Sequence, residues 1–306
     1  MSETHRTGWE KPLNPSLYAP DEEEKAFMQA TTGIQDDEEL KAHIIAVQTK
    51  AFELYKYPCI RQFDFMRLKM ARLPAYSQFT ELGKRREGAI FLDMGCCCIS
   101  VGNDIRKAVL DGWPIEGAIA ADLSEELWNA GHELFRSTPE TFPVPFFRGD
   151  ILDPAFLASA PVLPTCRTPP ATNTLSLPEM NTLTQLQGRI AAVHASSFFH
   201  LFKFDAQEQV ARRLAGLLSP IPGSMLFGTH GGLAVKGRWC PDEGTKMDCH
   251  SPESWEELWV GIFSEVDAEI DVKATMREHI GGLTVFGTYP GNAEQRYWLD
   301  WSVTRV

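Results

Sequence analysis

Three carboxylates stand at the carboxyl ends of three predicted strands. The strands, at 89–92, 115–122 and 144–150, are followed or closed by Asp93, Asp122 and Asp150. In a doubly wound sheet, ligands bind beyond the carboxyl ends of the strands, where the strand order reverses. A single aspartate at such a position is often only a helix cap. Three in succession favour a shared site for a ligand that carries positive charge and hydrogen-bond donors.

The turn after the first strand narrows the choice of ligand. A dinucleotide site requires Gly-x-Gly-x-x-Gly, so that a pyrophosphate can sit on the helix N-terminus. Gly95 and Gly102 are present, but position 97 is Cys97, so this fingerprint is missing. A carboxylate at Asp93 would repel a pyrophosphate and attract a cation. The pattern therefore favours the amino group and sulfonium of S-adenosylmethionine, with Asp122 accepting hydrogen bonds from both ribose hydroxyls.

Histidines follow the fourth and fifth predicted strands, at 190–194 and 223–229. Methyl transfer is an in-line displacement that needs an aligned nucleophile. A carboxylate substrate is already ionised, whereas a phenol or enol would benefit from a base, and histidine suits that role at neutral pH. We expect His194, His200 and His230 at the mouth of the site as candidate bases. For His200, packing among the neighbouring phenylalanines is the alternative.

The cysteines and histidines indicate no metal site by their spacing. The chain has seven cysteines, three of them adjacent at 96–98, an arrangement that suits neither a disulfide framework nor a zinc motif. A set of His230, Cys240, Cys249 and His250 matches no strong zinc pattern either. A short-chain dehydrogenase is disfavoured, because no tyrosine is followed by a lysine four residues later.

Composition excludes several partners. The chain has 306 residues, with 29 basic and 41 acidic side chains and a net charge of −12. Such a chain has no electrostatic footprint for nucleic acid or an anionic membrane. No window approaches about 18 apolar residues, so we expect no membrane span. The polar N-terminus lacks the apolar core of a signal peptide, and with the odd cysteine count this predicts a reduced, cytoplasmic protein.

The predicted elements divide the chain at about residue 87. Residues 1–87 hold a proline-rich arm, acidic clusters at 21–24 and 36–39 that predict helix starts, and helical periodicity over 37–55 and 63–70. Residues 88–306 alternate the strands above with predicted helices at 104–111, 125–135, 205–218 and 251–263. Residues 155–187 predict a long surface loop. At the end, 266–274 precedes a predicted hairpin of 282–289 and 297–303. This order predicts an α/β fold with a mostly parallel sheet covered on both faces.

Several segments resemble class I S-adenosylmethionine-dependent methyltransferases, and in particular their fungal secondary-metabolite branch from meroterpenoid gene clusters. These are FLDMGCC at 91–97, ADL at 121–123 and HASSFFHLF at 194–202, with further likeness at 14–18, 57–63 and 72–76. The resemblance implies a Rossmann-like seven-stranded sheet with an antiparallel C-terminal strand and an N-terminal helical cap. It implies that Asp93 and Gly95 frame the cofactor's methionine end and Asp122 the ribose. Further implied cofactor residues are Gln62, Cys97, Gly102, Leu123, Asp150, Ile151, His194 and Ala195.

The resemblance also implies that the protein is an O-methyltransferase of fungal natural-product biosynthesis. Its implied substrate is a carboxylate or hydroxyl of an apolar terpenoid or meroterpenoid intermediate. The expected partner is this small apolar substrate, and the oligomeric state stays open, a homodimer included. The turn between Cys97 and Gly102 is about three residues longer than in the family. This departure favours a second hypothesis: a methyltransferase fold without methyl transfer, such as a cyclase, an isomerase or a binding protein.

Overall fold

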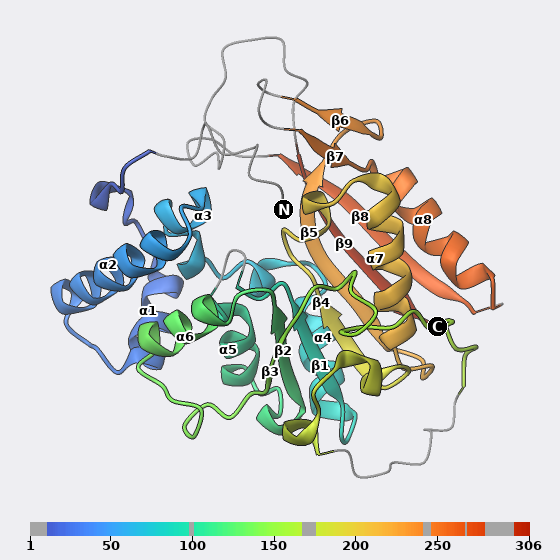
Figure 1. Cartoon of the computed structure of the whole chain (residues 1–306), viewed down its shortest axis with the longest axis horizontal. Coiled ribbons are helices and arrows are strands. Elements are labelled where there is room, and N and C mark those ends of the chain that lie inside the picture. The colour runs from blue at the N-terminus through green and yellow to red at the C-terminus, as the bar shows by residue number, and fades with distance from the viewer. Residues whose placement is uncertain (1–10, 98–100, 167–175, 241–245, 267, 279–296) are drawn as a thin grey trace.

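A seven-stranded sheet forms the centre of the protein. The computed structural model describes residues 11–97, 101–166, 176–240, 246–266, 268–278 and 297–306. The strands are β1 (Ile90–Met94), β2 (Ala118–Asp122), β3 (Phe146–Arg148), β4 (Ile190–His194), β5 (Met225–Gly232), β8 (Ile270–Glu278) and β9 (Tyr297–Arg305). Their order is β3-β2-β1-β4-β5-β9-β8 (Figure 1). The first five are parallel, and β9 runs antiparallel to both β5 and β8. This confirms the predicted Rossmann-like sheet with an antiparallel C-terminal strand.

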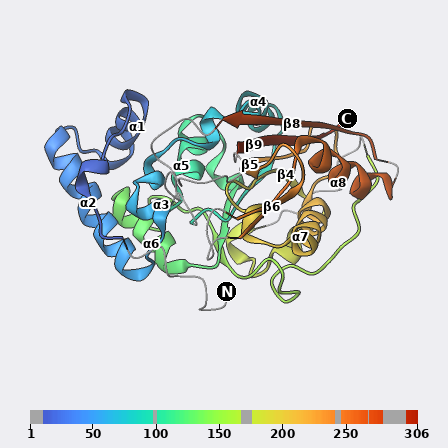
Figure 2. The same ribbon diagram turned by 90° about the horizontal axis from the view of Figure 1, so that it is seen from above.

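Helices cover both faces of the sheet. They are α1 (Glu22–Thr32), α2 (Asp37–Leu54), α3 (Pro58–Arg61), α4 (Tyr76–Arg85), α5 (Asn103–Leu110), α6 (Glu125–Leu134), α7 (Phe204–Leu217) and α8 (Pro252–Ser264). Successive strand residues point to opposite faces: Phe91 packs in the core with α4, α5 and α6, and Leu92 packs in the core with α7 and α8. From above, α4 and α7 lie on opposite sides of the sheet (Figure 2). Within the described part of the chain, no helix is both long and apolar enough to cross a membrane.

The predicted helix starts are confirmed. Asp21 caps α1 and Asp36 caps α2, each accepting a hydrogen bond from the backbone N–H three residues on. Ser251 caps α8, with Pro252 in the first turn. Such caps satisfy backbone donors that a helix otherwise leaves without partners.

Two predictions about segments need correction. The helix expected over 63–70 is wrong: these residues form the short 3₁₀ turns η3 (Asp64–Met66) and η4 (Met70–Arg72). Phe63 adopts a left-handed conformation with φ of 60°, which a continuous α-helix cannot accommodate. The strand expected over 282–289 lies outside the described residues. In the structure, β9 pairs with β8, so the partner in the C-terminal antiparallel pair is 270–278.

Other connections are short or irregular. The described residues of the predicted loop at 155–187 contain the 3₁₀ turns η6 (Leu177–Glu179) and η7 (Leu183–Leu186). Beyond β5, the short strands β6 (Gly237–Trp239) and β7 (Met247–Cys249) form a separate antiparallel pair that the sequence pattern did not indicate.

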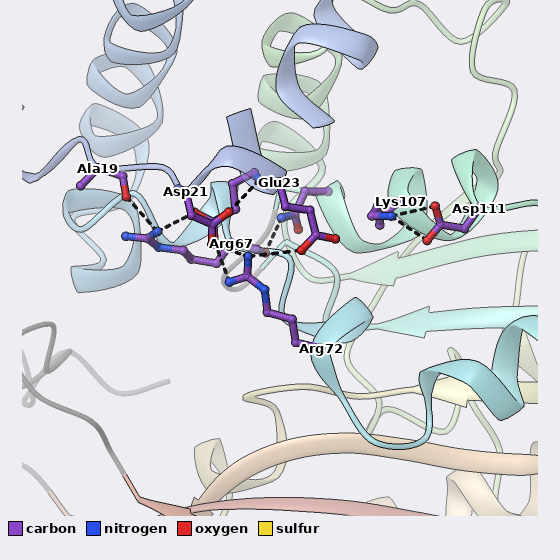
Figure 3. A network of polar contacts seen from close by, with 9 residues as sticks. Ala19, Asp21, Glu23, Arg67, Arg72, Lys107 and Asp111 are labelled. Atoms are coloured by element: carbon purple, nitrogen blue, oxygen red, sulfur yellow. Dashed lines mark hydrogen bonds and ion pairs between the residues drawn. The ribbon is translucent and has the colours of Figure 1, made fainter. Parts of the chain in front are cut away.

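A buried carboxylate ties α1 to the segment before α4. Glu24, whose side chain is 0% exposed, accepts hydrogen bonds from Arg67 Nη1 at 2.6 Å and Arg72 Nη1 at 2.9 Å. Arg72 Nη2 also contacts Asp21 Oδ2 at 2.5 Å (Figure 3). Hydrogen bonds between charged groups are roughly twice as strong as neutral ones. The segment 67–72 is therefore held firmly against the N-terminal helix.

The same segment holds the start of α5. The carbonyl of Arg67 accepts a hydrogen bond from Asn103 Nδ2 at 2.8 Å, and the backbone N–H of Met70 donates to Asp104 Oδ1 at 3.1 Å. Residues 67–72 thus link the N-terminal helices to the helix that follows β1. This link positions the end of the sheet where the sequence predicts a ligand.

Replacing Glu24 by alanine should lower the free energy of unfolding by about 3 kcal/mol, because Arg67 and Arg72 lose their buried carboxylate. Urea denaturation measures the change. Glu23→Ala is the matched control: its carboxylate is 3.7 Å from Arg72 and its side chain is 58% exposed. The control should cost less than about 0.5 kcal/mol, and equal losses in the two variants would contradict the assigned role of Glu24.

Candidate active site

A small cleft opens at the carboxyl ends of β1 and β4. Since β1 has β2 on one side and β4 on the other, this is the topological switch point of the sheet, where ligands of such folds bind. The cleft is lined by Lys69, Asp93, Met94, Gly95, Cys96, Asp104, His194 and Ser196. Two strand ends, the turn after β1, the first turn of α5 and the segment before α4 therefore meet here.

Asp93 and His194 form a buried ion pair across the two strands. They are neighbours in the β1–β4 register, and both side chains are 2% exposed. Asp93 Oδ1 lies 2.8 Å from His194 Nδ1, and His194 Nε2 lies 2.6 Å from Ser196 Oγ. Burial alone would lower the pKa of His194, but the hydrogen bond and charge of Asp93 outweigh it and raise that pKa. Asp93 Oδ2 has no hydrogen-bond partner among the described residues, so it can accept from a ligand.

Asp104 and Lys69 add one charge of each sign to the cleft. Asp104 lies in the first turn of α5, and burial, with a contribution from Asp93, raises its pKa to about 6. Lys69 comes from the segment that α1 holds in place. A cleft with carboxylates and an ammonium group close together suits a zwitterion such as the amino-acid end of a ligand. Lys69, Asp104 and Ser196 are residues of the cleft that the sequence does not predict. Only Asp104 had a signal, as the carboxylate that opens the helix after the turn.

The two glycines of the turn are required by its backbone. Gly95 has φ of +73°, and a Cβ there would lie 2.6 Å from the ring of Phe198. Gly102 has φ of +79°, and a Cβ there would lie 2.7 Å from Trp128. Residues with side chains seldom adopt this conformation. The residues that lengthen the turn, 98–100, lie outside the described part of the chain.

Asp122 hydrogen-bonds to the turn after β1 and is not part of the cleft lining. Its Oδ2 accepts a hydrogen bond from the Cys97 backbone N–H at 2.9 Å, and its Oδ1 from the Ser124 N–H at 3.1 Å. The structure therefore brings Cys97 and Asp122 together, as one site would require. The next residue, Leu123, is 59% exposed, so an apolar side chain is available at the end of β2.

Three other predicted cofactor residues follow the carboxyl ends of β3 and β4. Asp150 is exposed, two residues beyond β3, and accepts a hydrogen bond from the Leu152 N–H; Ile151 is buried. Ala195 is buried, and β5 approaches it so closely that a Cβ on Gly228 would lie 2.1 Å from its carbonyl oxygen. The predicted residues outside the cleft lining are Gln62, Cys97, Gly102, Asp122, Leu123, Asp150, Ile151 and Ala195.

His230 does not lie at the mouth of the site, contrary to expectation. It sits within β5 at 0% exposure, against Phe199, Trp255 and Trp301. Burial lowers its pKa well below the ordinary value, so the ring is neutral. The strand predicted from the sequence ends at 229, before His230 and the two glycines that follow it. In the structure those glycines continue the pairing with β9, which carries the strand to 232.

His200 is half-buried in the turn η8 (Phe199–Leu201) after β4. Its Nδ1 faces the backbone N–H of Gly231 at 3.4 Å, and its ring centre is 6.5 Å from that of Trp298. A ring whose Nδ1 accepts a hydrogen bond carries its proton on Nε2 when neutral. Its role as a base remains a prediction.

Large apolar side chains are exposed around the same edge of the sheet. Leu123, Leu201 and Val235 follow the carboxyl ends of β2, β4 and β5, and Met276 lies near the carboxyl end of β8. Each of these side chains is available to an apolar ligand that reaches this edge.

Comparisons with known proteins agree with this geometry. Residues 13–66 match the model of the meroterpenoid methyltransferase N-terminal domain. The chain is 30% identical over 270 residues to O-methyltransferase phiE of Fungal sp. (strain ATCC 74256), an alignment covering 85% of this chain and 77% of phiE. It is 30% identical over 238 residues to the Asnovolin E/Chermesin D methyltransferase nvfJ of Aspergillus novofumigatus, covering 77% and 74%.

Among solved structures, the chain is similar to 1,6-didemethyltoxoflavin-N1-methyltransferase of Burkholderia thailandensis. The TM-score is 0.47 at 14% identity, covering 86% of this chain and 90% of that one.

The buried carboxyl of Asp104 should make stability depend on pH. Its pKa of about 6, against 3.8 for an ordinary aspartate, means that the folded protein holds this proton more tightly than the unfolded chain does. The stability contributed by this group is therefore present below pH 3.8 and is lost as the pH rises through about 6.

Asp104→Asn keeps an acceptor for the Met70 N–H and should remove that loss, about 2 to 3 kcal/mol of unfolding free energy. Urea denaturation at several pH values measures it. Asp150→Asn, at an exposed aspartate that also accepts a backbone N–H, should leave the parent's pH profile in place. An unchanged profile in Asp104→Asn would refute the assignment.

Proposed function

The chain belongs to the family of fungal methyltransferases that includes phiE and nvfJ, and from this we propose that it is an S-adenosylmethionine-dependent O-methyltransferase of natural-product biosynthesis. We propose as its substrate a carboxylate, or else a hydroxyl, of an apolar terpenoid or meroterpenoid intermediate. The observation that carries the proposal is the charged cleft at the switch point, which is lined by Asp93, whose Oδ2 is buried without a hydrogen-bond partner among the described residues.

The cleft fits the amino-acid end of the cofactor. Asp93 Oδ2 would accept a hydrogen bond from the amino group, and Lys69 would pair with the carboxylate. The carboxylates of Asp93 and Asp104 would also favour the positive sulfonium. When bound, S-adenosylmethionine supplies the activated methyl group.

The ribose and adenine would extend from the cleft toward β2 and β3. Asp122 would accept hydrogen bonds from the ribose hydroxyls, since each carboxylate oxygen can accept more than one. The exposed Leu123 and the buried Ile151 would face the adenine, and Asp150 would accept from its amine. Gly95 would bring the backbone close to the cofactor.

The state of the histidines favours a carboxylate substrate. His194 has both ring nitrogens directed at Asp93 and Ser196, and His230 is buried. His200 directs Nδ1 at a backbone N–H. Of the three, only His200 remains a candidate to remove a substrate proton, which a hydroxyl substrate would need. A carboxylate needs no base at neutral pH, so the chain would only orient it in line with the methyl group and exclude water.

We also propose that residues 1–87 act as a cap on the methyltransferase domain at 88–306. Lys69 brings the cap's charge into the cleft, and Met70 hydrogen-bonds the first turn of α5. The exposed apolar residues around the carboxyl edge of the sheet support an apolar substrate beside the cofactor.

Asp122→Asn should weaken binding of S-adenosylhomocysteine by about tenfold or more, because hydrogen bonds to a charged acceptor contribute about 1.5–3 kcal/mol. Isothermal titration calorimetry measures the dissociation constant. Glu125→Gln, at the exposed first residue of α6, is the control and should bind as the parent does. A dissociation constant that stays the same in Asp122→Asn would rule out the ribose assignment.

The reaction is tested by incubating the protein with S-adenosylmethionine and a panel of terpenoid carboxylic acids and matching alcohols. Mass spectrometry should find a gain of one methylene on an acid. His200→Gln should keep this rate within about tenfold, whereas loss of a true general base costs about 10²–10⁴-fold. An isomer of unchanged mass would favour the cyclase or isomerase alternative and overturn the proposal.

A further inference from the structure

Two thiols and a carboxylate meet between the ends of β1 and β2. Cys96 Sγ and Cys97 Sγ lie 3.6 Å apart, far beyond the ~2.0 Å of a disulfide bond. These two sulfur atoms and a carboxylate oxygen of Asp122 all lie within 4.8 Å of one another. All three side chains are buried. Among the cysteine, histidine and acidic side chains of the described residues, these three have ligand atoms close enough together to share one metal ion.

The spacing matches a tetrahedral metal. Zinc binds cysteine sulfur at about 2.3 Å, which places two sulfur ligands of a tetrahedron about 3.8 Å apart. The observed 3.6 Å between the sulfur atoms of Cys96 and Cys97 is close to that edge. The carboxylate of Asp122 is oriented by the N–H groups of Cys97 and Ser124. Such outer hydrogen bonds are what hold metal-binding carboxylates in position.

A buried arginine balances the charge of this cluster. Arg106, in α5, is 4% exposed and donates from Nη1 to the Gly102 carbonyl and from Nη2 to Ser137 Oγ. Its guanidinium lies close enough to Cys96 and Cys97 for their charges to act on it, and its Nε has no partner among the described residues.

With both thiols protonated, the charges of Arg106 and Asp122 cancel. A divalent cation that replaces the two thiol protons leaves that balance unchanged, because two thiolates and a carboxylate then face a dication and a guanidinium. Asp93 is also near Cys96, but its charge is paired with His194. Buried charges that are compensated in this way avoid the usual desolvation penalty.

We propose that Cys96, Cys97 and Asp122 form a binding site for Zn²⁺ or another thiophilic divalent cation. On binding, two metal–sulfur bonds and one metal–oxygen bond form, and the two thiol protons leave to solvent. A water molecule would supply the fourth ligand. The expectation from sequence spacing was that no metal binds. Spacing could not indicate this site, because its third ligand comes from the next strand of the sheet.

The site also has a consequence for the cofactor, which rests on the proposed function. Asp122 is the acceptor proposed for the ribose hydroxyls, so a metal on Asp122 and a bound cofactor should exclude one another. Zinc would then act as a competitor of the cofactor at the turn after β1.

The test is calorimetric titration of ZnCl₂ into the reduced, metal-free, full-length protein. Cys96→Ser and Cys97→Ser should each weaken zinc binding by at least about tenfold, the range that even outer partners of metal ligands contribute. Cys240→Ser, at an exposed cysteine away from the cluster, is the control and should bind as the parent does. Equal zinc affinity in the parent and in both variants would overturn the proposal.

Titration of the parent protein with CoCl₂ covers the case in which the serine variants fail to fold. Ligation by the two thiolates should give a sulfur-to-cobalt charge-transfer absorption in the near ultraviolet, which ZnCl₂ should abolish and which Cys240→Ser should keep. Absence of that absorption would overturn the site.

A competition arm separates the two proposals. Zinc binding that S-adenosylhomocysteine does not weaken would keep the metal site and refute the ribose role of Asp122. Cofactor binding without zinc binding would keep the methyltransferase proposal and refute the metal site.

Discussion

The ion pair between Asp93 and His194 fixes the chemistry of the switch point. A buried carboxylate or imidazolium alone would be costly, and each offsets the desolvation of the other. Because the two residues are neighbours in adjacent parallel strands, their pairing is set by the register of β1 and β4. Ser196 fixes the far side of the imidazole ring. One oxygen of Asp93 then remains directed at the cleft, with a position determined by the sheet rather than by a loop.

The other charges of the cleft are positioned from outside the sheet. Glu24 holds Arg67 and Arg72, and the segment between those arginines presents Lys69 to the cleft and binds the first turn of α5. A charge supplied by the segment before α4 can therefore be located as firmly as one supplied by a strand. The N-terminal helices and the sheet also share one continuous hydrophobic core on this face.

The sequence locates candidate site residues where a local pattern fixes their position in the chain. Asp93 and Asp122 could be placed because each closes a short apolar run, and Gly95 because a turn must follow directly. His230 could not be placed, since the length of β5 is decided by its pairing with β9, more than sixty residues later. Lys69 had no local signal, because its segment is held beside the cleft by the ion pairs of Arg67 and Arg72 with a distant helix. Long-range contacts account for both failures.

The close approach of β5 to the end of β4 restricts which residue related chains can carry at position 228. No side chain fits between the backbone at Gly228 and the carbonyl of Ala195. Ala195 directly follows His194, so any residue larger than glycine at this position would displace the strand end that carries the imidazole. A relative with another residue there must have reshaped the cleft. One backbone position without a side chain therefore serves as a marker of whether a homologue keeps the same site.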